Sequence, residues 1–363
     1  MVDTAIEASA AFAASGGNAN CHGEFAAAHR SDEVLESARA TVARLLGAPV
    51  VDGVWFGANM TTMTFAFTRA VERTLKPGDR VVGSRLDHDA NVATWRVAAE
   101  AAGAEHVLAP FDPVTGQLDM DAMLGLIDER TRWVAVTGAS NLIGSTTDLA
   151  PIVSAAHAVG ARVFVDAVHL VPHHRVDVAA LGVDALVTSP YKWYGPHAGA
   201  MWVEPELMAS LPVAKVRPAP DDGPRRWETG TASFESLAAV EAAARFLLDE
   251  SMDVVAAAEA AVCAPLLAGL QAIAGVRVWG PPTMDGRVPT VAFTVDGCHC
   301  DEVAQTLAAD KIAVWAGHSY AVEVVDQLGL ADSGGVVRAG VVRYVNHDDV
   351  QRLLTTVSRL ARR

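Results

Sequence analysis

Apolar and polar positions along the first two thirds of the chain switch repeatedly between the period of a strand and that of a helix. Short apolar runs predict strands over residues 51–56, 80–84, 105–109, 132–137, 162–165, 184–188 and 198–203. Amphipathic segments between them predict helices over residues 31–46, 120–127 and 149–159, and two more that end near residues 75 and 102. Strands that alternate with helices in this way predict an α/β fold, in which helices cover both faces of a mostly parallel sheet.

The pattern changes after Ser233. Two long helices are predicted there, then four strands and a last helix, over residues 234–248, 254–273, 276–279, 290–295, 312–315, 336–342 and 348–360. This order predicts a second, smaller α+β domain. We therefore place a large domain at residues 16–236 and a small C-terminal domain at 237–363, with residues 1–15 as a helix that packs near the small domain.

Composition and charge narrow the possible partners. The chain has 363 residues, 51% of them apolar and 20% charged, which is typical of a globular protein with a large core. The formal net charge of −15 argues against a nucleic acid or an anionic membrane surface as a partner. No apolar run is expected to span a bilayer, and the first residues lack the basic segment of a signal peptide. The expected location is the cytoplasm.

The cysteines predict neither a disulfide framework nor a metal centre. There are four, Cys21, Cys263, Cys298 and Cys300, and they are too few and too scattered for a framework of disulfides. The run Cys298-His299-Cys300 offers adjacent ligands without the second pair that a zinc site needs, so no metal is predicted.

A lysine stands between two core strands, within the turn formed by residues 189–196 (SPYKWYGP). Partial burial of a lysine lowers its pKa, and such an amine can act as a nucleophile that forms a Schiff base with an aldehyde cofactor. A lysine at a strand end can equally extend its charged group to solvent. The turn alone leaves both interpretations of Lys192 open.

Other polar residues share its position relative to the strands. His88, Asn141, Asp166 and Lys192 all lie at or just past the carboxyl end of a predicted strand, where binding sites of open α/β sheets are found. Asp166 could cap a helix or pair with an arginine, but a carboxylate and a lysine at one sheet edge are also what pyridoxal phosphate requires. The small and polar residues 57–62, between a strand and a helix, suit an anion. No dinucleotide-binding glycine fingerprint or Walker lysine is present, which disfavours nucleotides.

With these motifs the chain resembles the class V aminotransferase family of fold-type I pyridoxal-phosphate enzymes, and the cysteine desulfurases in particular. Residues 86–91 (LDHDAN) resemble the motif whose histidine stacks on the cofactor ring, which is His88 here, and residues 140–144 (SNLIG) resemble the segment with the asparagine near the ring hydroxyl, Asn141. Asp166 matches the partner of the ring nitrogen, and Lys192 matches the Schiff-base lysine. The resemblance implies the fold of these enzymes, with a mostly parallel sheet of seven strands, and pyridoxal 5'-phosphate as cofactor.

The resemblance extends to the phosphate, the substrate and a second subunit. It implies that Ala58, Asn59 and Ser189 lie near the cofactor phosphate, and that Tyr191 replaces a phosphate-binding histidine. His169 replaces the usual glutamine near the ring hydroxyl. Thr231 belongs to a Gly-Thr segment that reaches the phosphate of a neighbouring subunit, which implies a homodimer with shared active sites. Arg338 matches the arginine that binds the substrate α-carboxylate.

One departure concerns the reaction. Residues 317–321 read GHSYA, so Tyr320 stands where the desulfurases have their nucleophilic cysteine. The resemblance therefore implies a pyridoxal-phosphate enzyme of a desulfurase-like subgroup without that cysteine, acting on a small amino acid. β-Elimination of the C–S lyase type comes first, with Tyr320 as a candidate acid; racemisation or epimerisation and transamination are the alternatives. No counterpart of the family's N-terminal segment near the substrate is recognised, and this motivates a rival from another class: a catalytically silent, cofactor-binding homodimeric partner protein.

Overall fold

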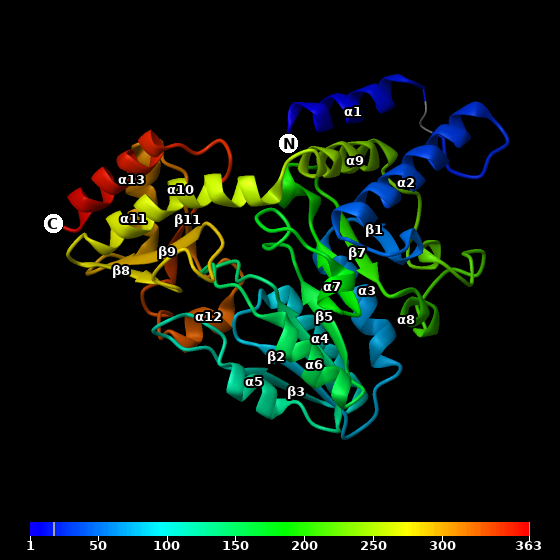
Figure 1. The fold of residues 1–363 in the computed structure, drawn as a ribbon, viewed down its shortest axis with the longest axis horizontal. Coiled ribbons are helices and arrows are strands. Elements are labelled where there is room, and N and C mark those ends of the chain that lie inside the picture. Colours follow the sequence, from blue (N-terminus) through cyan, green and yellow to red (C-terminus); the bar gives the residue numbers. More distant parts are fainter. Residues whose placement is uncertain (17–18, 363) are drawn as a thin grey trace.

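The large sheet has seven strands and confirms the predicted α/β class. A computed structural model describes residues 1–16 and 19–362, and the sheet order is β1-β7-β6-β5-β4-β2-β3 (Figure 1). The strands are β1 (Val54–Gly57), β2 (Arg80–Ser84), β3 (Glu105–Ala109), β4 (Thr131–Thr137), β5 (Arg162–Asp166), β6 (Ala185–Thr188) and β7 (Gly199–Val203). Strands β2 to β6 pair in parallel, whereas β7 runs antiparallel to both of its neighbours. The sheet is therefore mostly parallel, as predicted.

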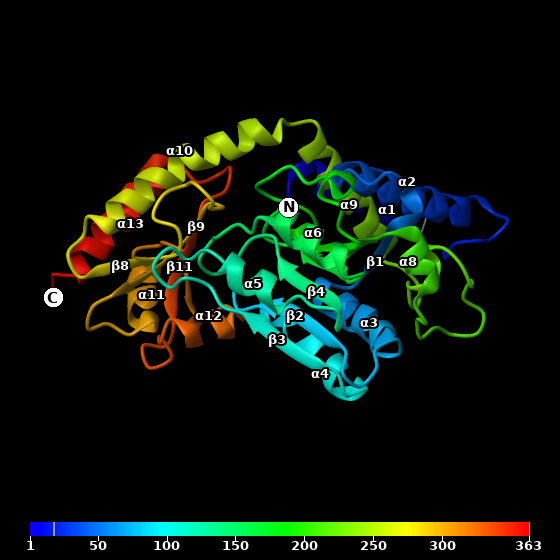
Figure 2. The same ribbon diagram turned by 60° about the horizontal axis from the view of Figure 1, so that its bottom comes forward.

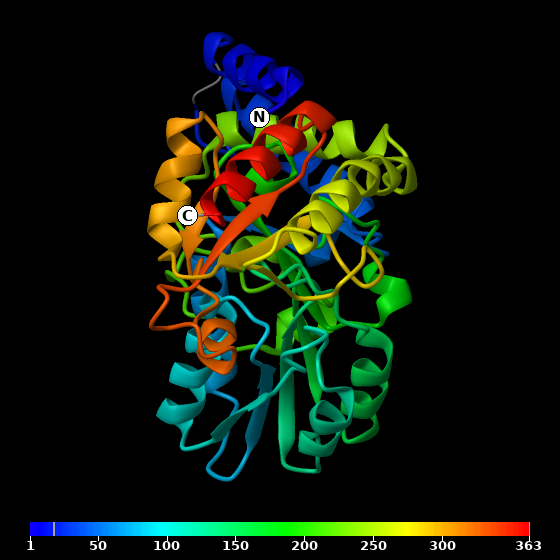
Figure 3. The same cartoon turned by 90° about the vertical axis from the view of Figure 1, so that its left-hand side faces the viewer.

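Helices cover both faces of this sheet because its strands are apolar on both sides. In β5, Val163 and Val165 pack in one core cluster, whereas Phe164 between them packs in the other. The first face is covered by α2 (Ala26–Leu45), α5 (Met120–Leu126), α6 (Leu149–Ala158), α7 (Val178–Leu181) and α9 (Phe234–Leu248). The second face is covered by α3 (Met60–Glu72), α4 (Ala93–Ala102) and α8 (Pro205–Ser210) (Figure 3).

Two boundaries in this part differ from the prediction. Helix α2 begins at Ala26, five residues before the predicted start, and Ser31 lies inside it with its hydroxyl donating to the Ala27 carbonyl oxygen at 3.3 Å. Polar residues that resemble an N-cap thus occupy a helix interior. The first strand also starts late, because Val51–Gly53 forms a 3-10 turn before β1.

The small sheet has four antiparallel strands in the order β10-β11-β9-β8. They are β8 (Val276–Trp279), β9 (Thr290–Val295), β10 (Trp315–Gly317) and β11 (Val336–Gly340), packed with α10 (Met252–Gln271), α11 (Cys300–Ala309), α12 (Val322–Gln327) and α13 (His347–Leu360). The predicted strand over residues 312–315 is wrong, because only its last residue is in β10. Helices α11 and α12 were not predicted from the sequence.

Helix α10 corrects the expectation that no segment could span a bilayer. Its 20 residues are long and apolar enough by length and composition alone, which is weak support for a membrane span. Core helices of soluble proteins pass the same test, and Leu266, Leu267 and Leu270 of α10 are buried in the core of the small sheet. The cytoplasmic location and the absence of a membrane partner stay predictions.

The N-terminal helix lies against α9, a helix on the first face of the large sheet. Helix α1 (Asp3–Ala14) runs along α9, and the ring of Phe12 lies 6.3 Å from the ring of Phe234 (Figure 1). Helix α10 then continues from this region to the small sheet (Figure 2). The division of the chain at residues 236 and 237 stays a prediction.

A buried arginine links the loop after β4 to β8 and β9 of the small sheet. The guanidinium of Arg287 donates to the carbonyl oxygen of Ile143 at 3.0 Å and to that of Trp279 at 3.0 Å, and it also donates to the carbonyl oxygens of Thr290 and Pro281. Close approach of the chains around it requires glycine, since a Cβ at Gly144 would lie 2.6 Å from the Thr290 oxygen. We call Arg287 and these four carbonyl groups the interdomain clasp. Burial lowers the pKa of Arg287 to about 10.

Candidate active site

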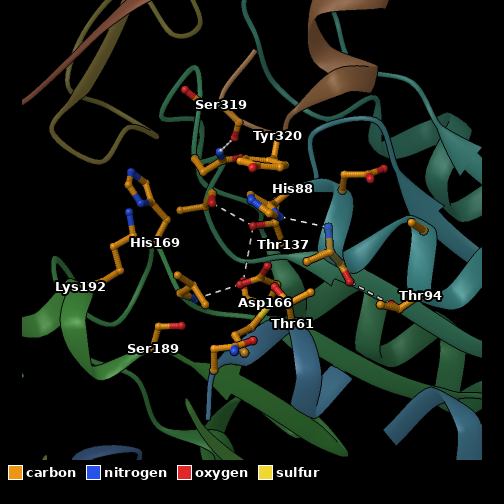
Figure 4. A pocket seen from close by; sticks show the side chains of 18 of the residues that line it. Thr61, His88, Thr94, Thr137, Asp166, His169, Ser189, Lys192, Ser319 and Tyr320 are labelled. Carbon is orange, nitrogen blue, oxygen red and sulfur yellow. Dashed lines mark hydrogen bonds between the residues drawn. The ribbon is translucent and has the colours of Figure 1, made fainter. Parts of the chain in front are cut away.

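Adjacent parallel strands bring the predicted polar residues to one edge of the large sheet. Asp166 ends β5, and His88, Asn141 and Lys192 follow β2, β4 and β6, which are the neighbours of β5 or the next strand along. All four side chains line one cavity of about 720 Å³ (Figure 4). This volume is typical of sites for small molecules and cofactors.

Lys192 lies in a tight turn that faces this cavity. Ser189 precedes a 3-10 turn over Pro190–Trp193, and Tyr194 ends it in a left-handed conformation with φ of 70°. The buried indole of Trp193 anchors the turn by donating to the Thr188 hydroxyl at 3.1 Å. Burial and the nearby Arg338 guanidinium lower the pKa of Lys192. The amine is therefore easier to deprotonate than an exposed lysine, which favours nucleophilic and proton-transfer roles.

Asp166 is buried at the base of the cavity. One of its carboxylate oxygens accepts from the Val168 N–H at 2.9 Å, and burial raises the pKa of Asp166 to about 6. Asp87 is also buried nearby, where it accepts from the Ser84 hydroxyl and from the Asn91 amide, and burial raises its pKa strongly. A buried carboxylate such as Asp166 is stabilised in its charged form by a cation placed against it.

The rings of His88 and Tyr320 stack on each other, and both residues line the cavity. Their rings are 5.3 Å apart at 28° (Figure 4). His88 accepts from the Ala90 N–H through Nδ1 at 3.0 Å, and burial lowers its pKa to about 4, so the imidazole is neutral near pH 7. A neutral flat ring suits stacking on an aromatic cofactor.

Asn141 and Arg338 form the side of the site that adjoins the small sheet. Arg338 donates to the Asn141 carbonyl oxygen at 2.7 Å, and the Asn141 amide donates to the Ser319 carbonyl oxygen at 2.7 Å. Burial lowers the pKa of Arg338. The guanidinium is thus held in place with donor groups to spare for a planar anion such as a carboxylate.

His169 lies on the cavity wall near Lys192 (Figure 4). Its Nε2 lies 2.9 Å from the Thr290 hydroxyl, and its ring meets the ring of His173 edge-on at 5.7 Å. His173 in turn lies 2.8 Å from the Glu259 carboxylate of α10, and both are buried. Burial holds the pKa of His169 well below its usual value, so this imidazole is neutral.

The start of α3 and the lysine turn supply groups for an anion. Asn59 caps α3 by accepting from the Thr62 N–H at 2.9 Å, and Asn59, Thr61, Ser189 and Tyr191 all line the cavity. The first N–H groups of a helix lack partners within it and attract negative charge. The Tyr191 ring stacks on His197 at 5.3 Å. The structure therefore brings together groups that suit a phosphate.

Two predicted residues lie outside the residues that line this cavity. Ala58 adjoins Asn59 but does not line the cavity, and Thr231 lies on an exposed loop. That loop follows Glu228, whose carboxylate pairs with the buried guanidinium of Arg39 at 3.1 and 3.2 Å and accepts from the Phe56 N–H. The role of Thr231 in a neighbouring subunit stays a prediction.

Several lining residues were missed from the sequence. They are Phe65, Ala93, Thr94, Thr137, Ala139, Val168, Trp315 and Ser319, whereas Met60, Thr61, Asp89 and Ala90 lie in segments 57–62 and 86–91, which the sequence already indicated. Most are small or apolar and carried no chemical signal. Trp315 and Ser319 flank the Gly317-His318 pair, so their closeness to Tyr320 in the chain could have indicated them.

The residues present fit pyridoxal phosphate. Asn141 Oδ1 and His169 Nδ1 are buried without a hydrogen-bond partner, although both residues line the cavity. Buried polar atoms normally have partners, so these two are suited to contact a bound polar molecule. A raised-pKa carboxylate opposite a lowered-pKa lysine, with a helix N-terminus beside them, matches a ring nitrogen, an aldehyde and a phosphate.

This fold and site define a pyridoxal-phosphate-dependent enzyme of fold type I. The model of the class V aminotransferases matches residues 3–353, and the chain belongs to that family. It is 31% identical over 361 residues to a cysteine desulfurase of Dickeya dadantii (strain 3937), covering 93% of this chain and 86% of the relative. It is 33% identical over 371 residues to an uncharacterised protein of Mycobacterium tuberculosis (strain CDC 1551 / Oshkosh), covering 98% and 91%.

Solved structures agree with this assignment. The crystal structure of the cysteine desulfurase CsdA from Escherichia coli superimposes with a TM-score of 0.88 at 26% identity, covering 98% of this chain and 91% of that one. A lysine variant of the protein C-DES, which holds glycine covalently linked to its pyridoxal-phosphate cofactor, has the same fold, with a TM-score of 0.82 at 18% identity over 98% and 93%. The predicted family, fold type and cofactor are confirmed.

Proposed function

We propose that this protein catalyses a pyridoxal-phosphate-dependent β-elimination on a small amino acid, as a C–S lyase, and that it forms no persulfide on its own chain. The observation that carries the proposal is the position of Tyr320. It lines the cavity in the loop where the resemblance to desulfurases expects a cysteine, and no cysteine is among the lining residues of the described chain. An elimination releases the sulfur in the leaving group, so it needs no protein thiol.

Three of the four cysteines, all outside the cavity lining, support this proposal. Burial raises the pKa of Cys21 to about 11 and that of Cys263 to about 12. Cys300 is closest along the chain to the small-sheet part of the site, but its thiol donates to the Gly334 carbonyl oxygen at 3.2 Å, and burial raises its pKa. Thiols with raised pKa values carry little thiolate and are poor nucleophiles.

The roles of the residues follow from their positions. When bound, pyridoxal phosphate supplies an aldehyde that links to amines and a ring that accepts the electrons left at Cα after proton removal. Lys192 would take the proton from Cα, and Asp166 would stabilise positive charge at the ring nitrogen. His88 would pack on the ring, Asn141 and His169 would hold its hydroxyl side, and Arg338 would bind the α-carboxylate. Tyr320 is placed to give a proton to the departing group.

A panel of amino acids tests the proposal. The purified protein, loaded with pyridoxal phosphate, is mixed with cysteine, S-methylcysteine, alanine and serine. We expect a keto acid, ammonia and a free thiol to form in equal amounts from S-methylcysteine. Racemisation would appear as loss of optical activity without ammonia, and transamination as keto acid without ammonia. A persulfide on a protein cysteine, formed from cysteine together with alanine, would overturn the proposal. No spectral response to any amino acid would indicate a silent cofactor-binding partner protein.

The assembly is a separate proposal. The Thr231 loop is exposed and lies outside the cavity of its own chain, which supports a homodimer in which it reaches the phosphate of the other subunit. Mixing Thr231→Ala protein with Lys192→Ala protein tests this arrangement. If each site combines the two subunits, a mixed dimer contains one site with both changes and one site with neither, so activity returns on mixing. Two parents that stay inactive in a proven mixed dimer would contradict the shared site.

A further inference from the structure

The mouth of the cavity carries two exposed aromatic side chains, of which the proposed elimination uses only Tyr320, as a proton donor. Trp315 and Tyr320 are 70% and 66% exposed, yet both line the cavity. Single exposed aromatic residues are common on protein surfaces. These two lie on one short segment, on either side of Gly317, and both border the space above the catalytic groups. We call Trp315, Ser319 and Tyr320 the rim.

The backbone at Tyr320 has a conformation that residues with a side chain rarely adopt. Ser319 and Tyr320 have φ of 46° and 60°, in the left-handed region. The Tyr320 N–H donates to His318 at 2.9 Å, and its carbonyl oxygen accepts from the Asp89 N–H at 2.7 Å. With the ring also stacked on His88, Tyr320 is fixed from several sides. Strain of this kind persists where the surroundings over-determine it, and it concentrates at functional sites.

Trp315 lies beside the group that binds the substrate carboxylate. In the register of β10 and β11, Trp315 is directly opposite Arg338. Side chains directly opposite in an antiparallel pair project from the same face and approach each other closely. A substrate whose carboxylate is held by Arg338 and whose amine faces Lys192 therefore extends its side chain along the rim.

The charges around the cavity limit what that side chain can be. Lys192 and Arg338 serve the amine and carboxylate of the substrate, and Asp166 lies at its base. Among the described lining residues, Asp89 is the one other carboxylate, and its own N–H is bonded to Tyr320. A negative group at the rim would thus meet Asp89 and two aromatic rings, which is unfavourable. The remaining wall includes apolar side chains such as Phe65 and Ala93.

We propose that the rim is a subsite for an apolar or aromatic group carried on the β-sulfur of the substrate, so that the protein cleaves S-substituted cysteines whose leaving group is an apolar thiol. The inference rests on the proposed elimination and names its substrate class. Lys192 takes the Cα proton, the Cβ–S bond breaks with its electron pair on sulfur, and the thiolate takes a proton and leaves. The enamine that remains is hydrolysed by water, so one substrate and one water give one thiol, one pyruvate and one ammonium, with no oxidant or reductant.

The test is a matched series of substrates that differ only in the sulfur substituent. The holoenzyme is assayed with S-methylcysteine, S-butylcysteine, S-benzylcysteine and S-carboxymethylcysteine, and thiol and pyruvate are measured. We expect kcat/KM for S-benzylcysteine to exceed that for S-methylcysteine by roughly tenfold or more, because apolar pockets discriminate by about this factor for each well-packed group. S-carboxymethylcysteine should be the poorest of the series.

Variants of the rim show where this preference arises. Trp315→Ala should lower the ratio of kcat/KM between S-benzylcysteine and S-methylcysteine by about tenfold, mainly through KM, and Trp315→Phe should restore most of it. The matched control is Tyr344→Ala, which removes another aromatic side chain, 79% exposed and outside the cavity lining. That change should leave the ratio as it is in the unchanged protein.

Binding gives a second measurement that does not depend on turnover. The affinity for each substrate is read from the change in cofactor absorption on mixing, also with Lys192→Ala protein loaded with the cofactor. If no substrate is cleaved but S-benzylcysteine still binds tighter through Trp315, the elimination fails and the rim subsite stands. If thiol and pyruvate form equally well from all four substrates, or best from S-carboxymethylcysteine, the rim subsite is wrong and the elimination stands.

Discussion

The floor and the rim of the cavity are built in opposite ways. The floor, formed by Thr137, Asp166 and Ser189 at the ends of β4, β5 and β6, is at most 4% exposed and lies in regular parallel strands. The rim starts in β10 of the small sheet and continues into the turn after it, is largely exposed, and contains two consecutive residues with positive φ. The floor carries groups that suit the cofactor. The rim carries Tyr320, which stands where the desulfurases have their cysteine, so we infer that the rim bears mainly on the substrate.

The interdomain clasp explains how two such different parts keep one geometry. Arg287 donates to Ile143, two residues after Asn141, and to Thr290, whose hydroxyl is bonded to His169. Arg338 on the small sheet donates to Asn141 in turn. A shift of one domain against the other would therefore break hydrogen bonds at buried groups, which is unfavourable by about 1–3 kcal/mol for each group left without a partner.

The largest effect is expected from removing the amine on the floor side. Lys192→Ala should lower turnover by about 10⁴-fold or more, because both the covalent attachment of the cofactor and proton transfer at Cα are lost. Borohydride reduction followed by mass analysis should find the cofactor on residue 192 in the unchanged protein and on no residue in the variant. The control is Lys215→Ala, whose amine donates to the Ala219 carbonyl oxygen away from the cavity. Cofactor attached to another lysine would contradict the assignment.

The next largest effect is expected from a variant that removes the interdomain clasp. Arg287→Met should lower the free energy of unfolding by about 3–5 kcal/mol, because several buried carbonyl groups lose their donor. Urea denaturation of the holoenzyme measures it. The matched control is Arg277→Met, where the guanidinium lies 3.8 Å from the Trp279 ring on an exposed position, and about 1 kcal/mol or less is expected. Equal losses in both variants would show that the clasp adds nothing to stability.

The contribution of Asp166 to stability should depend on pH, and differently with and without the cofactor. Burial raises the pKa of Asp166 to about 6 in the folded protein, from 3.8 in the unfolded chain. The folded state then binds more protons than the unfolded state between these values, so this contribution to stability is present below about pH 4 and is lost as the pH rises through about 6. For cofactor-free protein the loss amounts to about 3 kcal/mol at most.

Denaturation of cofactor-free protein at pH 4, 5, 6 and 7 measures this loss against Asp166→Asn, in which it should be absent. Pyridoxal phosphate should reduce it, since a protonated ring nitrogen gives the carboxylate a partner. Asp112→Asn is a control in which the change of stability with pH has the opposite sign. Hydrogen bonds from the Val114 N–H and the Thr115 hydroxyl lower the pKa of Asp112, so its contribution to stability is lost as the pH falls. Parallel pH curves for the unchanged protein and Asp166→Asn would contradict the raised pKa.

Asp166 and Ser189 of the floor and Tyr320 of the rim could be predicted from the sequence, whereas Thr137, Trp315 and Ser319 could not. Each residue of the floor follows an apolar run, and parallel strands bring their carboxyl ends to one edge whatever the loops do. Trp315 was predicted as the last residue of a strand over residues 312–315, because these residues (IAVW) form a short apolar run. The structure pairs only Trp315, Ala316 and Gly317 with β11, so the tryptophan lies at the start of the strand and beside the cavity.

Pairing partners and turn conformations of this kind depend on contacts between distant segments, which periodicity does not encode. The same holds for the start of α2, where a polar cluster around Ser31 resembles a cap but lies within the helix. It also holds for the His173–Glu259 pair, whose members are 86 residues apart.

The smallest effect tests whether the rim stores strain that the floor does not. Ser319 has φ of 46°, and a left-handed conformation costs a residue with a side chain about 1–2 kcal/mol. Ser319→Gly removes that cost but adds about 0.4–1 kcal/mol of backbone entropy in the unfolded state. The variant should therefore be more stable by roughly 0.5 kcal/mol, a rise in Tm of about 1 °C that calorimetry can measure.

The controls for this change separate strain from function. Ser319→Ala keeps the strain and should gain nothing, whereas Lys311→Gly, at a residue with φ of 60° outside the cavity, should gain a similar amount. Of the two glycine variants, only Ser319→Gly should lower the preference for S-benzylcysteine over S-methylcysteine, by about threefold, because a freer Tyr320 packs less well on the substrate. A Ser319→Gly protein that is less stable than Ser319→Ala would mean that the turn is relaxed. In that case the positive φ values at the rim would be a property of the loop alone, and only the exposed rings would remain as support for a substrate subsite.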